Sequence, residues 1–135
     1  MVRRAHQISV AIFSEETAAF GVTPVQFAIL SVLHRAPGID QITLAQRVAF
    51  DAATIGSVVS RLITKGWVHR QAAERDRRRK LLWLTEAGSE ALRGMTSHMP
   101  VVQARIVEGL SLSERAQFAE LIAKLVAHHE RESAP

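Results

Sequence analysis

The chain contains no cysteine, and this absence excludes several kinds of chemistry at once. It rules out a disulfide scaffold, a cysteine-based metal site, a thiol nucleophile and a cysteine redox sensor. No apolar run approaches the roughly 18–20 residues that cross a bilayer. Residues 1–4 are followed by a mixed polar stretch and not by the apolar block of a secretory signal. We therefore expect a soluble, cytoplasmic protein without a membrane segment.

The motifs of common enzymes are also missing. The sequence contains no HExxH, no P-loop, no GxSxG and no glycine-rich phosphate cradle. The neighbouring His128 and His129 cannot share one helical face as metal ligands at positions i and i+4 do. Asp51 fits a helix cap better than a catalytic acid. We therefore expect no enzyme, no catalytic residue, no cofactor and no metal site.

The residues that are present suffice for one hydrophobic core. The chain has 135 residues, and 47% of them are hydrophobic. A chain of this size and composition is neither disordered nor of low complexity. No internal repeat and no linker rich in glycine, serine or proline divides it. We therefore expect a single, mostly helical domain over residues 1–135.

The first half of the chain carries signals that predict four helices. The first helix is expected over residues 2–19. Gly21 ends the first helix. The second begins at the capping box of Thr23 and Gln26, with Pro24 between them, and ends at Pro37-Gly38. Asp40 and Asp51 are the N-caps of the third and fourth helices, and Gly66 ends the fourth. In the fourth helix apolar residues recur every three to four positions, so one face is expected to be buried.

The pattern then changes to short β-prone runs at residues 67–70 and 81–84. The polar stretch 71–80 between them is too long for a tight turn. We therefore expect a two-stranded hairpin with an extended tip. A lone hairpin is only marginally stable, so this one is expected to pack on the helices.

The positive charge is concentrated in this same segment. The formal net charge of the whole chain is +4. Residues 69–80 carry six basic and two acidic side chains, and the flanking segments 1–68 and 81–135 contribute +2 and −2, which cancel. Such a concentration is typical of a protein that binds a polyanion. Taken alone, an arginine-rich run is equally well interpreted as a solvated loop.

The last third predicts two long helices with apolar faces. Thr85 is an N-cap for one, and Ser111 with Glu114 forms a capping box for the other. The fifth helix carries a seam at 3-4 spacing and the sixth a stripe; their residues are Leu92, Met95, Met99, Val102 and Ile106, and Phe118, Leu121, Ile122, Leu125 and Val126. Together with the apolar first helix, these faces exceed what one small domain covers, so we expect a homodimer. The alternative is that the helices fold back on their own chain. The polar tail from Glu130 is expected to fray.

The order of elements describes a winged helix-turn-helix. The fold class is therefore mainly α with a small β-hairpin wing, plus N- and C-terminal dimerisation helices. A helix of about 15 residues is roughly 22 Å long and fits the major groove of DNA, about 12 Å wide. In the fourth helix, the small side chains of Thr54, Ser57 and Ser60 allow close approach to base edges. Arg61 and Lys65 near its end are expected to reach phosphates.

Five short stretches carry a resemblance to a known family. They are Leu44-Ala45, residues 54–62, Lys65-Gly66-Trp67-Val68, Asp76-Arg77-Arg78 and Leu84-Thr85-Glu86-Ala87-Gly88. Asp-x-Arg followed at this spacing by Leu-Thr-x-x-Gly is fairly specific. On these residues the chain resembles the MarR family of bacterial winged-helix transcription regulators. With the flanking helices, the resemblance covers nearly the whole chain.

The resemblance implies a homodimer with intertwined terminal helices that grips a pseudo-palindromic operator on double-stranded DNA. The winged core is then about 23–88, and the dimerisation helices are about 1–20 and 89–132. By the same resemblance, Thr54, Ser57, Ser60 and Arg61 face DNA, Arg78 enters the minor groove and Asp76 orients the wing. The other wing candidates are Arg75, Arg77 and Arg79. The alternatives are a local ion pair for Asp76 and Arg78 and plain helix surface for Ser57 and Ser60. Repression is implied as the family's commoner mode.

The resemblance also implies a small effector, often an aromatic acid, that enters a crevice and releases DNA. Thiol oxidation, another mechanism of the family, is excluded because cysteine is absent. Residues 4–9 look similar to the first helix of relatives that respond to aromatic acids. We expect a crevice between the first, second and fifth helices, with polar groups from Arg4, His6 and Ser9 and an apolar wall of Phe13, Phe27 and Leu30. Alternatively, the apolar residues belong to the core and His6 to a cap or a dimer interface.

Two other functions share the basic wing. An architectural protein that binds DNA or RNA without sequence specificity would discriminate poorly between sequences. A winged-helix module that contacts protein instead of DNA is the other alternative. The aromatic content is 5%, and no RRM or KH pattern is present, which argues against recognition of single-stranded RNA.

Overall fold

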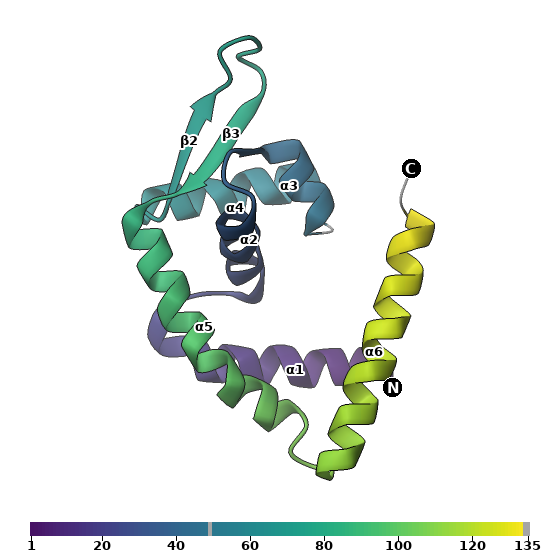
Figure 1. Ribbon diagram of the computed structural model, residues 1–135. Coiled ribbons are helices and arrows are strands. Elements are labelled where there is room, and N and C mark those ends of the chain that lie inside the picture. The colour runs from purple at the N-terminus through teal and green to yellow at the C-terminus, as the bar shows by residue number, and fades with distance from the viewer. Residues whose placement is uncertain (49, 134–135) are drawn as a thin grey trace.

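Long helices frame a unit of shorter helices and a small sheet in the computed structural model, which describes residues 1–48 and 50–133 (Figure 1). The elements in chain order are α1 (Val2–Thr17), a 3-10 turn η1 (Ala18–Phe20), α2 (Pro24–Arg35), β1 (Ile39–Asp40), α3 (Gln41–Arg47), α4 (Ala52–Thr64), β2 (Val68–Ala72), β3 (Lys80–Leu84), α5 (Glu86–Ile106) and α6 (Leu112–Ser133). The expected fold class, mainly helical with a small β wing, is confirmed.

The predicted helix caps are present with their hydrogen bonds. Thr23 and Gln26 form the full capping box at the start of α2, and Ser111 and Glu114 do the same before α6. Single side-chain caps come from Asp40 for α3, Asp51 for α4 and Thr85 for α5. These bonds satisfy N–H groups that a helix start leaves without partners, which is why short sequence signals locate them so well.

The sheet has one strand more than the sequence predicted. Strands β2 and β3 form the expected hairpin, with Val68 opposite Leu84 and Ala72 opposite Lys80. The two-residue strand β1 adds to the other edge of β3, so the order is β1-β3-β2. Gly38, at a φ of 82°, donates its N–H to the carbonyl oxygen of Leu82 at 2.8 Å. The hairpin is therefore as predicted, whereas β1 was not predicted because two residues are too few to show strand periodicity.

The core lies where the short helices meet the sheet and the N-terminal half of α5. Fully buried side chains come from α2, α3, α4, β3 and α5; they include Ile29, Leu30, Leu33, Leu44, Ile55, Val59, Leu62, Leu82 and Met95. The predicted seam of α5 therefore divides. Its first residues, Leu92 and Met95, join this core, whereas Ile106 at its end is exposed. α5 thus connects the winged unit to the rest of the chain.

Helix α1 packs against the C-terminal half of α5 through a network of charged and polar side chains. Glu16 accepts a hydrogen bond from Arg105 Nη1 at 2.9 Å and lies 3.0 Å from His98 Nε2. Glu15 accepts from the other nitrogen of the same guanidinium at 2.9 Å. The hydrogen bonds from His98 and Arg105 lower the pKa of Glu16. This part of the chain folds back on itself, as the alternative to dimerisation had it for α1 and α5.

Helix α6 stands apart from the other elements, beyond the turn that joins it to α5 (Figure 1). Its predicted apolar stripe is exposed; the residues are Phe118, Leu121, Ile122, Leu125 and Val126. The helix continues to Ser133, and the expectation of a fraying tail from Glu130 stays a prediction. The last turn includes contacts of His128 Nε2 and His129 Nδ1 with the Glu132 carboxylate, at 3.5 and 3.7 Å.

Within residues 1–48 and 50–133, no single helix is long and apolar enough to cross a membrane. The pair formed by residues 2–20 and 24–35 meets the criteria of length and composition only when both helices are taken together, across a bend of 72°.

Candidate nucleic-acid interface

One face of α4 is an exposed stripe of small and polar side chains. Ser57, Ser60 and Arg61 lie on it, as the sequence predicted. Ala53 and Thr64 are exposed at the same helical spacing and extend the stripe at both ends. Neither residue was predicted from the sequence, although the helical spacing indicates both. Short side chains leave room for base edges to approach the helix.

Thr54 is placed differently from the other predicted residues of α4. Its backbone N–H donates to Asp51 Oδ1 at 2.9 Å, and its hydroxyl donates to Asp51 Oδ2 at 2.8 Å. These bonds, from the backbone first and then from the hydroxyl, lower the pKa of Asp51. Thr54 is half-buried. The structure therefore makes Thr54 part of the helix cap, because its hydroxyl is held by the carboxylate of Asp51.

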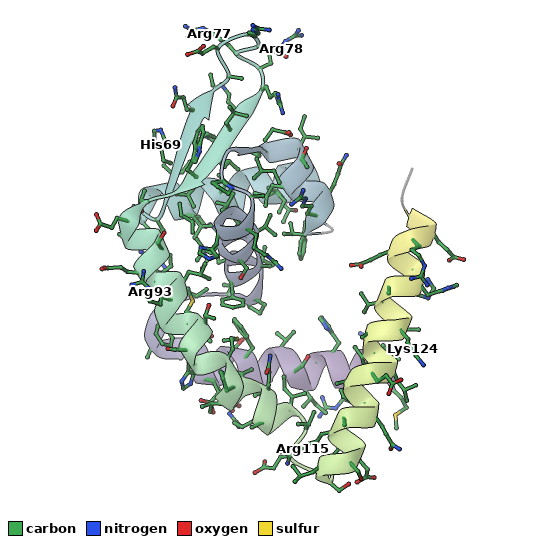
Figure 2. All side chains as sticks on the ribbon, in the orientation of Figure 1. His69, Arg77, Arg78, Arg93, Arg115 and Lys124 are labelled. Carbon is green, nitrogen blue, oxygen red and sulfur yellow. The ribbon has the colours of Figure 1, made fainter. Side chains whose placement is uncertain are left out.

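The wing tip is an exposed loop that Asp76 organises. Asp76 Oδ1 accepts the backbone N–H of Arg78 at 3.1 Å and lies 3.5 Å from Arg78 Nε. Nevertheless, the Arg78 side chain is 95% exposed. Arg75 and Arg77 are exposed too, and Figure 2 shows Arg77 and Arg78 together at the far end of the wing. The ion pair shapes the loop and leaves the Arg78 guanidinium accessible, so the two interpretations of this pair are compatible.

Asp40 ties the base of the wing to α3. Arg79 Nη2 lies 3.3 Å from Asp40 Oδ2, and Thr43 donates to the same carboxylate through its N–H and its hydroxyl. The bonds from Thr43, and then the contact with Arg79, lower the pKa of Asp40. Arg79, which was predicted to contact DNA, therefore forms an ion pair that connects the base of the wing to the start of α3.

The start of α3, the start of α4 and the wing meet around a small cavity of about 110 Å³. Its lining residues are Asp40, Gln41, Ile42, Ala52, Arg78, Arg79 and Lys80. Ile42 is 67% exposed, and Gln41 accepts a hydrogen bond from Arg70 Nη1 at 3.4 Å. No site role was predicted from the sequence for Gln41, Ile42 and Arg70. Arg70 was visible within the basic segment, whereas only the pairing of β1 brings Gln41 and Ile42 beside the wing.

Lys65 is held away from the stripe of α4. Its ammonium group donates to the carbonyl oxygen of Gly21 at 2.7 Å and lies 4.2 Å from the centre of the Trp67 ring. Gly21 is in the left-handed conformation, with a φ of 64°. Lys65 therefore connects the end of α4 to the turn after η1, and the predicted phosphate contact would require this bond to open.

These elements supply the two parts that binding to a DNA duplex needs. α4 offers a polar face on a helix that a major groove can admit, and the start of α4 lies beside the base of the wing. The wing adds arginines that face solvent and can neutralise phosphates.

A separate cavity of about 290 Å³ lies between α1, α2 and α5. It is lined by His6, Ser9, Val10, Phe13, Pro24, Val102 and Ile106. A crevice between these three helices was predicted, with His6, Ser9 and Phe13 among its residues. From the sequence, Val102 and Ile106 were predicted only on the seam of α5, and Val10 was not predicted as a site residue.

Three predicted ligand-binding residues lie outside this lining. Leu30 is fully buried in the core, so its assignment to the cavity wall was wrong. The Phe27 ring contacts the Phe13 ring, with ring centres 5.7 Å apart, and packs against the core. Arg4 is exposed and donates to Gln7 Oε1 at 3.5 Å. Helical spacing predicts which side of a helix is apolar, but not which of its residues end in a core and which border a cavity.

The chain is similar to transcriptional regulators over nearly its full length. Residues 20–79 match the model of the MarR family. The HTH-type transcriptional repressor NicR of Pseudomonas putida is 29% identical over 126 residues, which span 93% of this chain and 80% of NicR.

Solved structures agree with this likeness. A probable transcriptional regulator from Pseudomonas aeruginosa is 34% identical and superposes with a TM-score of 0.83 over 92% of both chains. BpsR of Bordetella bronchiseptica, whose DNA binding is regulated by 6-hydroxynicotinic acid, is 27% identical. Its TM-score is 0.85, over 93% of this chain and 95% of BpsR.

Proposed function

Since the chain belongs to the MarR family of transcriptional regulators and is thus a DNA-binding regulator, not an enzyme, we propose that it is a homodimeric repressor that a small aromatic acid releases from its operator. It acts on double-stranded DNA in the cytoplasm. The observation that carries the proposal is the exposed polar stripe of α4 beside an arginine-tipped wing. The name of NicR, a repressor, supports the sign of regulation.

The second protomer covers α6. This helix has 22 residues and an exposed apolar stripe, and no other element of the described chain packs along it. Burying a Leu, Ile or Phe side chain is worth about 1.5–3 kcal/mol, so a stripe of such residues favours a partner. Two-fold symmetry makes the same surface serve both protomers. Residues of about 1–20 and 89–132 form the dimerisation part, and about 23–88 form the winged part.

Each winged part then reads one half-site. The stripe of Ser57, Ser60 and Arg61 faces base edges in the major groove, and Arg78 enters the adjacent minor groove. Arg75 and Arg77 neutralise phosphates. In a two-fold dimer the half-sites lie about one helical turn apart, so the operator is pseudo-palindromic.

The experiment is a fluorescence-anisotropy titration at fixed salt with duplex from just upstream of the protein's own gene. A scrambled duplex of equal length is the control. We expect the native duplex to bind about a thousandfold tighter or more, and light scattering to give two chains per protein particle. If a selection from random duplexes also yields no preferred sequence, the protein is a non-specific architectural binder and the proposal fails.

The effector site is the cavity between α1, α2 and α5. Its wall is apolar and includes the Phe13 ring, while His6 and Ser9 supply polar atoms. A ring with one carboxylate suits this combination of an apolar wall and a few polar groups. The regulation of BpsR by 6-hydroxynicotinic acid supports this class of ligand. Release requires that the acid binds the DNA-free conformation better than the DNA-bound one.

The effector proposal is tested by adding 6-hydroxynicotinic acid, and then a set of benzoic acids, to the operator complex. We expect at least one acid to release DNA, and His6→Ala to raise the concentration needed by about tenfold. His34→Ala is the control, because His34 is an exposed histidine on α2 outside this cavity. Release that is the same in both variants would remove His6 from the site, and no release by any acid would refute the ligand class.

A further inference from the structure

The free end of α6 carries a compact cluster of metal-binding side chains. His128 Nε2 lies 3.5 Å from Glu132 Oε1, and His129 Nδ1 lies 3.7 Å from Glu132 Oε2. One ligand atom from each of the three residues lies within 4.8 Å of the other two. All three residues are exposed. Within residues 1–48 and 50–133, it is the one group of three or more such side chains this close together.

Helix geometry explains how two adjacent histidines come to share a site. Successive residues of an α-helix are about 100° apart, so His128 and His129 do not lie on one line along the axis. Glu132 is four residues after the first and three after the second, and both spacings are contacts between neighbouring turns. Its carboxylate therefore lies between the two rings, whose centres are 5.0 Å apart. The expectation of no metal site followed from the spacing of the two histidines alone, and Glu132 was not part of it.

The separations match the coordination shell of a transition metal. Zinc binds imidazole nitrogen at about 2.0–2.1 Å and carboxylate oxygen at about 2.0–2.2 Å, in a tetrahedron. Neighbouring ligand atoms of such a tetrahedron are about 3.3–3.5 Å apart. His128 Nε2 already lies at this separation from Glu132 Oε1, at 3.5 Å, whereas His129 Nδ1 lies 3.7 Å from the other oxygen, Oε2, so binding through one oxygen requires the side chains to adjust. We propose that His128, His129 and Glu132 bind one divalent transition-metal ion, with Zn²⁺ as the reference ion.

The donor set decides the class of ion. Two imidazoles and one carboxylate suit Zn²⁺, Cu²⁺ and Ni²⁺, whereas Mg²⁺ and Ca²⁺ prefer oxygen ligands throughout. Three protein ligands leave the fourth position of a tetrahedron to water or to another donor. The bound ion joins successive turns at the end of α6 and stabilises that end of the helix. The site lies on α6, away from the wing and α4, so it does not depend on DNA binding (Figure 1).

The test is calorimetric titration of the full chain, without any added histidine tag, with Zn²⁺ in a non-chelating buffer. We expect one ion per chain. Glu132→Gln, and separately the double change His128→Ala with His129→Ala, should each weaken binding by about tenfold or more. The matched controls are Glu130→Gln, on the same helix but outside the cluster, and His34→Ala on α2. Both controls should bind Zn²⁺ like the original protein, and Mg²⁺ should not compete.

The circular-dichroism spectrum of each metal-free variant shows whether its helices are still folded before Zn²⁺ is added. The proposal is overturned if the original chain binds no Zn²⁺ or if the double histidine variant binds it equally well. It is also overturned if Glu130→Gln weakens binding as much as Glu132→Gln.

Discussion

At the scale of single residues, Gly88 fixes the junction between the wing and α5. Its N–H donates to the Thr85 hydroxyl oxygen at 3.0 Å, and that hydroxyl donates to the carbonyl oxygen of Gly66 at 2.6 Å. Gly88 is buried, and a Cβ atom there would collide with the carbonyl oxygen of Trp67. A backbone atom cannot turn away as a flexible side chain can. Only the absence of a side chain allows α5 to approach the backbone of Trp67, the residue before β2, so closely.

Gly88→Ala should therefore lower the free energy of unfolding by about 1–3 kcal/mol, the usual cost of overpacking. Chemical denaturation followed by circular dichroism measures it. The control is Gly109→Ala, in the turn between α5 and α6, where a Cβ atom meets nothing within 4 Å. A Gly88→Ala protein as stable as the control would show that the junction is less tight than the structure has it.

Arg78 is the residue whose exposure points most directly to DNA. Arg78→Ala should weaken operator binding and reduce the slope of log affinity against log salt by about one per protomer, since each phosphate contact releases about one counterion. Titrations at several salt concentrations measure both. Arg93→Ala, an exposed arginine on α5 (Figure 2), is the matched control. Unchanged affinity and slope would refute the minor-groove role of Arg78.

At the scale of elements, the contact between α1 and α5 depends on ionised groups. Glu16 is the acceptor for both His98 and Arg105, and their hydrogen bonds hold its pKa below the ordinary value of 4.5. A carboxylate with a lowered folded-state pKa contributes stability that is complete above its unfolded pKa. That contribution is lost as the pH falls through the folded-state pKa. The pairing of α1 with α5 is therefore expected to weaken in acid.

Glu16→Gln should reduce stability at pH 7, and the difference from the original protein should shrink as the pH falls below about 4.5. Urea denaturation between pH 7 and pH 3 follows this difference. Glu90→Gln, an exposed carboxylate on α5, should cost little at any pH. If the difference stays constant with pH, the ionised state of Glu16 does not stabilise the contact.

At the scale of the whole molecule, the chain consists of a winged unit, the exposed helix α6, and the helices α1 and α5 between them. The winged unit has its own core, and α5 continues from that core down to α1 and the turn before α6 (Figure 1). Leu125 on α6 is 53% exposed. Exposed apolar residues at regular helical spacing along a whole helix indicate an interface and not scattered surface positions.

Leu125→Glu should raise the dissociation constant of the proposed dimer by about tenfold or more, because a charge replaces a side chain whose burial is worth about 1.5–3 kcal/mol. Ala123→Glu places the same charge on the same helix, away from the stripe, and should leave the dimer intact. Light scattering over a range of protein concentrations distinguishes the two. Equal behaviour of both variants would mean that α6 is not the interface.

The sequence by itself determined the features that depend on neighbours a few residues away. The caps at Thr23, Asp40, Asp51 and Thr85 are bonds to residues three positions on, so their signals are local. The exposed face of α4 follows from helical period alone, and the basic wing tip from composition. These features also carried the family resemblance, which is why the fold class and the DNA-binding role were predictable.

Tertiary structure alone decided the contacts between distant segments. The pairing of β1 with β3, the bond from Lys65 to Gly21 and the network of Glu16 with Arg105 join residues 41 to 89 positions apart. Tertiary structure alone also decided that Leu30 lies in the core and that Val102 lines the cavity between α1, α2 and α5. Each of these depends on how helices are placed in space, and local preferences leave that placement free. For the same reason, periodicity could show an apolar stripe on α6 but not whether its own chain covers it.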